Sequence, residues 1–173
     1  YAHRATRIFS VSDALGRILA ASGIRNVTTL HNGIDAVVFR SDAAATKRIT
    51  ELLGARDRAV VLFAGRPTQS KGIGMLRQAF TALGDHPRRP ILLIAAPGSA
   101  GAPVREGSDV IRASFAPAEM PAVYAASDLV VVPSLYPDPF PTVNLEAGAA
   151  GRSVVGTCFG GTPEVVLDGD TGI

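Results

Sequence analysis

Two carboxylates, Asp138 and Glu146, lie eight positions apart in a segment that combines prolines with a short helical pattern. Asp138 begins the sequence Asp-Pro-Phe-Pro, which cannot be helix interior because proline fixes φ and removes an amide donor. From Thr142, a candidate N-cap, to Ala150 the residues favour a helix, and Gly151 can end it. Both carboxylates can then address one ligand over the helix N-terminus, where free N–H groups favour phosphate. This arrangement predicts a site for a sugar joined to a diphosphate.

A second candidate element is the loop Gly65–Gly72, GRPTQSKG, between an apolar run and an amphipathic helical pattern. Its Arg66 and Lys71 bring positive charge to the carboxyl end of a predicted strand, where open α/β sheets bind ligands. They could stabilise a departing diphosphate, and one charge-assisted hydrogen bond contributes about 1.5–3 kcal/mol. The loop is not a P-loop, because Gly72 stands where Ser or Thr is needed. Nor is it a dinucleotide fingerprint, because Arg77 replaces the third glycine.

Paired carboxylates also serve glycosidases, in which one is a general acid and the other a nucleophile or base. In such an enzyme the two carboxyl groups face each other across a glycosidic bond. The basic loop at Arg66 and Lys71 would have no purpose there, so the two elements together favour a phosphate-bearing sugar.

Three stretches together resemble a known family. The residues Asp138–Ala147 read DPFPTVNLEA, which is similar to the acidic-x7-acidic signature of retaining glycosyltransferases of family 4, enzymes with the two-domain B-type fold. The loop Gly65–Gly72 resembles the Gly-Arg…Lys-Gly segment of that family, and Gly160–Gly172 resembles its GG-x-PE…DG-x-TG ending. The resemblance covers essentially the whole chain. Asp138 replaces the usual glutamate of the family, and Pro141 replaces its usual glycine.

The resemblance implies a role for each candidate residue. Arg66 and Lys71 would contact the donor's phosphates, Asp138 would address hydroxyls of the transferred sugar, and Glu146 would contact the ribose. The catalytic candidates are Asp138, Arg66 and Lys71, and the donor-binding candidates are Gly65, Arg66, Lys71, Asp138, Phe140, Thr142 and Glu146. A nucleoside diphosphate sugar is the donor substrate in this reading. No cofactor is expected, since relatives generally work without a metal.

Some neighbouring residues remain open to two interpretations. Ser114 and Phe115 follow a predicted strand at the place where relatives hold the nucleobase, mostly through main-chain groups. Gly160 and Gly161 could serve a turn near the ligand, although turn geometry alone explains them as well. The three histidines show no metal-ligand spacing, and a structural role is expected for His31, beside a predicted domain connection.

Strands and helices alternate along the chain. The strands are expected at Thr6–Val11, Val27–Leu30, Ala59–Ala64, Pro90–Ala95, Val110–Arg112, Leu129–Pro133 and Ser153–Gly156. Several are continuously apolar, as are strands buried on both faces of a parallel sheet. An amphipathic helix is expected after Gly72, where apolar residues recur from Ile73 to Leu83, and another at Glu119–Ser127. This order predicts an α/β fold, a Rossmann-like doubly wound parallel sheet.

A domain boundary is expected near the Asn-Gly turn of Asn32-Gly33-Ile34-Asp35. Residues 1–38 would be the tail of an acceptor-binding domain with its interdomain connection. Residues 39–173 would be the donor-binding domain, truncated at its C-terminus. We therefore expect a fragment that holds donor-site residues without a complete active site.

The composition fits a globular domain. The chain has 173 residues, of which 47% are hydrophobic and 18% charged, and a formal net charge of +2. Its basic residues are scattered, which argues against a nucleic-acid partner. Cys158 is the only cysteine, so a cytoplasmic protein is expected, with this residue buried after a strand. No apolar run is long enough to span a membrane. Any peripheral contact with the inner membrane surface is expected through the acceptor-binding domain.

Three functions follow from these features. The first is transfer of a hexose from a nucleoside diphosphate sugar to a glycan, a lipid or a small molecule, with retention of configuration. The second is a nucleotide-sugar epimerase of the same fold. The third is a non-catalytic module that binds sugar nucleotides, and the one sequence feature that favours it is Asp138 in place of the usual glutamate.

Overall fold

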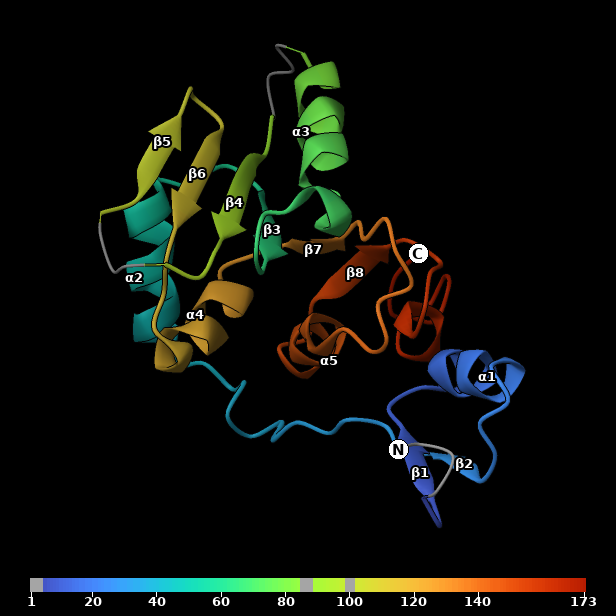
Figure 1. Ribbon diagram of the computed structural model, residues 1–173. Helices are drawn as coiled ribbons and strands as arrows, with labels where there is room; N and C mark the ends of the chain where they lie inside the picture. The colour runs from blue at the N-terminus through green and yellow to red at the C-terminus, as the bar shows by residue number, and fades with distance from the viewer. Residues whose placement is uncertain (1–4, 85–88, 99–101) are drawn as a thin grey trace.

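The chain folds around two separate β-sheets (Figure 1). The computed structural model describes residues 5–84, 89–98 and 102–173. The smaller sheet pairs β1 (Ile8–Ser10) in parallel with β2 (Val27–Thr29), and α1 (Asp13–Ala21) connects them. We call this part the N-terminal unit. Residues 30–42 lead from it to the remainder, which we call the main unit.

The larger sheet of the main unit has six strands within the described residues, in the order β5-β6-β4-β3-β7-β8. The strands are β3 (Val60–Ala64), β4 (Ile91–Ala95), β5 (Val104–Glu106), β6 (Val110–Ala113), β7 (Leu129–Val132) and β8 (Ser153–Gly156). All neighbours pair in parallel except β5, which runs antiparallel at the edge. The strand order reverses beside β3, so β3 and β7 flank the switch point where such sheets bind ligands.

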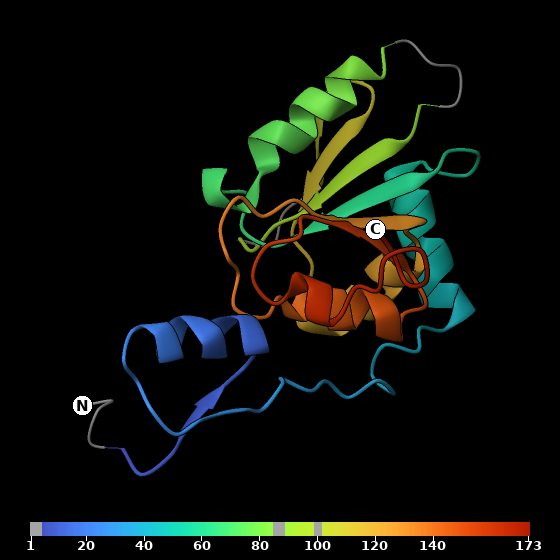
Figure 2. The ribbon, with the colours of Figure 1, turned by 90° about the vertical axis from the view of Figure 1, so that its right-hand side faces the viewer.

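Helices cover both faces of this sheet (Figure 2). They are α2 (Ala43–Leu53), α3 (Ile73–Ala82), α4 (Met120–Ala125) and α5 (Thr142–Ala149). Helices α2, α4 and α5 share one buried cluster with the sheet, whereas α3 packs Leu76 and Phe80 against the other face. Strand β4 is buried along its whole length between the two layers. The predicted doubly wound parallel sheet is therefore confirmed.

Three elements were not among the expectations. Helix α2 follows the expected domain boundary, and Asp42 caps it by accepting a hydrogen bond from Ala45 N at 2.6 Å. Helix α1 has a similar cap at Ser12. Strand β5 is short and exposed, so its residues lack the apolar run that marks the inner strands.

Two local predictions were wrong. Pro141, and not Thr142, occupies the N-cap position of α5, because its extended backbone (ψ 112°) places the first helical dihedrals at Thr142. Cys158 is exposed instead of buried. It follows β8 in the loop that approaches the Asp138 turn, outside the packed layers of the sheet. In the described part of the chain, the helices are too short or too polar to cross a membrane.

Candidate functional site

The loops that follow β3 and β7 meet at the switch point of the main sheet. Gly65 ends β3, and a 3-10 turn at Gln69–Lys71 leads through Gly72 into α3. Gly72 has a φ of 75°, and a Cβ on it would lie 1.8 Å from the carbonyl oxygen of Pro133 after β7. Only glycine allows this approach. A hydrogen bond from Leu135 N to Ser70 O, 2.8 Å long, also joins the loops.

Lys71 and Asp138 form an ion pair across this junction, between Lys71 Nζ and Asp138 Oδ2. The Asp138 carboxylate also accepts a hydrogen bond from the Tyr136 hydroxyl at 3.1 Å. The ammonium group lies 5.3 Å from the centroid of the Tyr136 ring. Burial acts to lower the pKa of Lys71, but the hydrogen bonds and charges of Asp138 and Tyr136 outweigh it and raise the pKa. Lys71 is therefore a fixed positive charge at the switch point.

A glycine pair holds the Asp138 turn from behind. Gly160 has a φ of 59°, and a Cβ there would lie 2.0 Å from the Asp138 carbonyl oxygen. Gly161 N donates a hydrogen bond of 2.9 Å to the same oxygen. The pair is therefore needed for close backbone packing, which supports the turn interpretation of the two glycines. No ligand contact is required to explain them.

Glu146 lies on α5, one turn from the helix start, as expected. Its Oε2 accepts a hydrogen bond of 2.7 Å from the hydroxyl of Tyr124 on α4. Tyr124 is fully buried, and burial together with the Glu146 charge raises the pKa of its phenol far above the ordinary value. The neutral phenol thus remains a donor and orients the carboxylate. The N-cap residue of α5 is proline, which has no side-chain acceptor, so within the described ranges no side chain caps the N–H groups of its first turn.

A hollow of about 450 Å³ opens at the carboxyl ends of β3, β4 and β6. It is lined by Ala64, Gly65, Ala95, Ala96, Pro97, Gly98, Ser114, Phe115, Pro117, Met120, Val143 and Glu146. Two donor-binding candidates, Gly65 and Glu146, thus share this hollow with both residues expected near the nucleobase. The lining is mostly apolar, which suits a flat aromatic base, and Glu146 is its carboxylate.

The remaining candidates are arranged less uniformly. Arg66 is exposed, and its side chain has no hydrogen bond or ion pair among the described residues. Thr142 is exposed at the start of α5, and Phe140 is buried with its ring stacked on His31. The structure thus joins Lys71 to Asp138 directly and places Glu146 in the neighbouring hollow.

Two tyrosines of the site were missed by sequence reasoning. Tyr136 stands two residues before Asp138, and that proximity to a candidate carboxylate was a usable signal. Tyr124 lies within the helix expected at Glu119–Ser127, but no role was predicted for its hydroxyl. Its bond to Glu146 depends on the packing of α4 against α5, which no local pattern reports.

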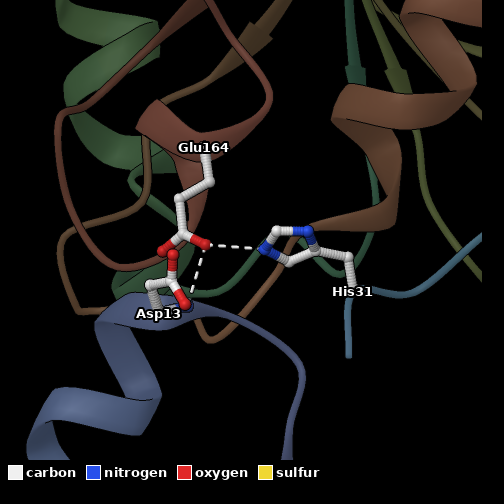
Figure 3. Close-up of side chains that lie close together, drawn as sticks. All are labelled: Asp13, His31 and Glu164. Carbon is white, nitrogen blue, oxygen red and sulfur yellow. Dashed lines mark hydrogen bonds and ion pairs between the residues drawn. The ribbon is translucent and has the colours of Figure 1, made fainter. Parts of the chain in front are cut away.

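A third group of polar side chains lies where the two units meet: Asp13, His31 and Glu164 (Figure 3). One ligand atom from each lies within 4.8 Å of the others. Both Glu164 oxygens already accept hydrogen bonds from backbone N–H groups, and Asp13 Oδ1 accepts a hydrogen bond from the Thr29 hydroxyl. These contacts give the group a structural explanation. His3 and His86 lie outside the described residues.

The comparisons with known proteins agree with this geometry. A sequence family described as Glycosyl transferases group 1 matches residues 58–173, from just before β3 to the last residue. Solved structures of B-type glycosyltransferases share the fold. The chain therefore belongs to the group 1 glycosyl transferases.

Several curated proteins are similar in sequence. The lipopolysaccharide 1,2-N-acetylglucosaminetransferase of Salmonella typhimurium is 34% identical over 84% of this chain and 42% of its own length. The D-inositol 3-phosphate glycosyltransferase of Corynebacterium aurimucosum is 34% identical over 86% of this chain and 39% of its own length. The alpha-maltose-1-phosphate synthase of Mycobacterium tuberculosis is 29% identical over 97% of this chain and 48% of its own length. The chain thus spans half or less of the length of these relatives.

Solved structures confirm the architecture. The crystal structure of Anabaena Alr3699/HepE in complex with UDP-glucose superposes with a TM-score of 0.85 over 99% of this chain and 50% of that protein, at 24% identity. A sucrose-phosphate synthase from Thermosynechococcus elongatus gives a TM-score of 0.82 over 99% and 45%, also at 24% identity. At this identity the likeness concerns the fold alone.

Proposed function

We propose that this chain is the donor-binding part of a glycosyltransferase that moves a hexose from a nucleoside diphosphate sugar to a glycan, a lipid or a small-molecule acceptor. The observation that carries the proposal is the Lys71–Asp138 pair across the switch point, beside the hollow that Gly65 and Glu146 line. It provides a cation for the diphosphate and carboxylates for sugar hydroxyls. The UDP-glucose bound to Anabaena HepE supports a donor of this class.

In the proposed reaction, the bond between the anomeric carbon and the diphosphate oxygen breaks while a bond to the acceptor oxygen forms. The acceptor proton leaves with the departing diphosphate or passes to solvent. Lys71 stabilises the negative charge that grows on the leaving group, together with the uncapped N–H groups of α5. Arg66, exposed on the same loop, adds a second positive charge. Retention of configuration belongs to the proposal and follows from the family resemblance.

Each carboxylate has a separate task in this site. Asp138 keeps Lys71 charged and in place until the donor arrives, and it then accepts hydrogen bonds from the sugar. Glu146, oriented by Tyr124 at 2.7 Å, accepts from the ribose hydroxyls at the mouth of the hollow. The nucleobase would occupy the apolar part of the hollow near Phe115. Metal independence and a cytoplasmic location stay predictions.

Calorimetric titration of this chain with UDP, GDP and ADP tests the proposal. One of the three should bind selectively, and Lys71→Ala should weaken that binding by about 10- to 150-fold, since a charge-assisted hydrogen bond contributes about 1.5–3 kcal/mol. Lys47, the only other lysine, lies on α2 outside the hollow, so Lys47→Ala is the matched control. Equal binding of the two variants would contradict the role of Lys71.

Product analysis separates the three functions named at the outset. A new glycoside, formed by a longer protein that contains this chain, supports transfer. A free sugar epimer supports the epimerase alternative, which finds no support among the relatives described above. Binding without turnover supports the non-catalytic module.

A further inference from the structure

Glu164 of the main unit caps a helix of the N-terminal unit. Its two carboxylate oxygens accept hydrogen bonds of 2.8 Å from Asp13 N and from Ala14 N, in the first turn of α1. Ser12 caps the next amide by accepting from Leu15 N at 3.1 Å. Helix starts carry free N–H groups and a partial positive charge, so a carboxylate is well suited to this place. The contact joins residues about 150 positions apart.

The same carboxylate holds His31, which lies just beyond β2 (Figure 3). His31 Nε2 donates to Glu164 Oε2 at 2.9 Å. Burial acts to raise the pKa of Glu164, but the amides of Ala14 and Asp13 and the imidazole outweigh it and lower the pKa. Glu164 is therefore ionised near neutral pH, and it fixes the imidazole at one ring nitrogen.

The imidazole in turn stacks on Phe140. The two ring centroids are 5.0 Å apart, and the ring planes differ by 10°. Phe140 is buried, and it lies in the turn between Asp138 and the start of α5. A continuous series of contacts thus runs from the start of α1, through Glu164 and His31, to the turn that carries Asp138.

We propose that Glu164 and His31 are positioning residues of the donor site: they hold Phe140, and with it the Asp138 turn, against the N-terminal unit. We call the contacts among Glu164, His31, Phe140 and the first turn of α1 the clasp. Neither positioning residue needs to touch the donor. The inference rests on the proposed function for the identity of its ligand.

Thermodynamic linkage makes the proposal quantitative. If the clasp favours the donor-binding arrangement of the turn, donor binding must strengthen the clasp by the same factor. The transferred sugar should depend on the clasp more strongly than the nucleotide does. Asp138, in the turn that the clasp holds, is assigned to the sugar, whereas Glu146, on α5, is assigned to the ribose. Loss of the clasp should therefore lower the affinity for a nucleotide sugar more than the affinity for the corresponding nucleoside diphosphate.

The test combines histidine NMR spectra with affinity measurements. The chain has three histidines, so its imidazole carbon–proton signals are few. Stacking on Phe140 should shift the His31 signal upfield, and Phe140→Leu should identify that signal by removing the shift. Affinities are measured for UDP-, GDP- and ADP-glucose, and for the matching nucleoside diphosphates, in the wild type, Glu164→Gln and His31→Ala.

Glu119→Gln is the matched control. Glu119 also accepts a hydrogen bond from a backbone amide, that of Ala116 at 3.0 Å, and pairs with a basic side chain, that of Arg48 at 2.9 Å. It is the last residue of the 3-10 turn Pro117–Glu119, directly before α4, and has no part in the clasp. An exchange of glutamate for glutamine at a capping position is thus tested in both places.

We expect Glu164→Gln to return the His31 signal toward its unstacked position. It should also lower the affinity for the nucleotide sugar by about fivefold or more, a factor near the lower end of typical coupling between two sites. His31→Ala should weaken it similarly, and Glu119→Gln should have no effect. The affinity for the nucleoside diphosphate alone should change less than twofold in every variant.

The opposite results are distinguishable. If the His31 signal moves in Glu164→Gln while the nucleotide sugar binds as before, the clasp exists but positions nothing, and the inference fails. If the wild type shows no shifted His31 signal, the clasp itself is refuted. If the wild type binds none of the three sugars, the proposed function fails along with the positioning role, whatever the state of the His31 signal.

Discussion

Removal of the Lys71 ammonium should destabilise the fold through the carboxylate that it leaves behind. In Lys71→Met the stem of the side chain is kept. Asp138, whose side chain is 10% exposed, then retains the Tyr136 hydroxyl as its one carboxylate partner among the described residues. Breaking a fully buried pair costs about 3–5 kcal/mol, and an exposed pair contributes about 0–1 kcal/mol. The Lys71 side chain is 30% exposed, so we expect a loss of about 2–3 kcal/mol.

The double variant Lys71→Met/Asp138→Asn separates the charge effect from lost packing. With no unpaired charge, its unfolding free energy should return to within about 1 kcal/mol of the wild type. Urea unfolding followed by circular dichroism measures both variants, and about 2 kcal/mol corresponds to a midpoint shift of about 1 M. Lys47→Met serves as the control. If the single and double variants are equally destabilised, the unpaired carboxylate is not the cause and the reasoning is refuted.

The same pair predicts a dependence on alkaline pH. The pKa of Lys71 is raised above its ordinary value of 10.5. Its contribution to stability is therefore fully present below pH 10.5 and is lost as the pH rises through the higher folded-state value. The difference between the wild type and Lys71→Met should accordingly be constant from pH 7 to pH 9 and shrink in stronger alkali.

Three further changes test the surroundings of the site by urea unfolding. Gly160→Ala should cost about 2 kcal/mol or more, because its Cβ would lie 2.0 Å from a carbonyl oxygen in addition to the left-handed strain of about 1–2 kcal/mol. Gly169 has a φ of 77°, and a Cβ there would meet no atom within 4 Å. Gly169→Ala should therefore lower the unfolding free energy by the backbone strain alone. Tyr124→Phe should cost about 1.5–3 kcal/mol by removing the hydrogen bond to Glu146; an unchanged midpoint would show that water replaces the hydroxyl. Asn144 is buried, and its amide has no partner among the described residues. Asn144→Leu should therefore stabilise the protein by about 1 kcal/mol, and destabilisation would indicate a bridging water.

Periodicity alone was enough to predict most of the main sheet. The run at β4 is continuously apolar because both of its faces are covered, and α3 is visible because Ile73, Leu76 and Phe80 recur at helical spacing. Helix α1 was harder to find, because none of its residues is buried in this chain. Strand β5 consists of three residues at an exposed edge, where packing imposes no apolar pattern.

The site was predictable in its parts but not in its connections. Asp138 and Glu146 stood out through their spacing around prolines, and Lys71 through its place after a strand. Their partners depend on contacts between segments that are distant in sequence. The capping role of Glu164 shows the same limit. Nothing in the sequence near residue 164 indicates that its carboxylate accepts hydrogen bonds from the first turn of a helix that starts at residue 13.

The segment between the two units also determines how firmly the clasp holds. Phe39 packs edge-on against Tyr124, with ring centroids 5.8 Å apart, so residues 32–38 act as the tether between His31 of the clasp and the main unit. A flexible chain of this length has an r.m.s. span of roughly 13–16 Å and gives an effective concentration on the order of millimolar. A few exposed hydrogen bonds would not hold two separate molecules together at micromolar concentration. Within one chain they can open and close again without the partners diffusing apart, so cleavage of the tether alone would convert a stable contact into one that is lost on dilution.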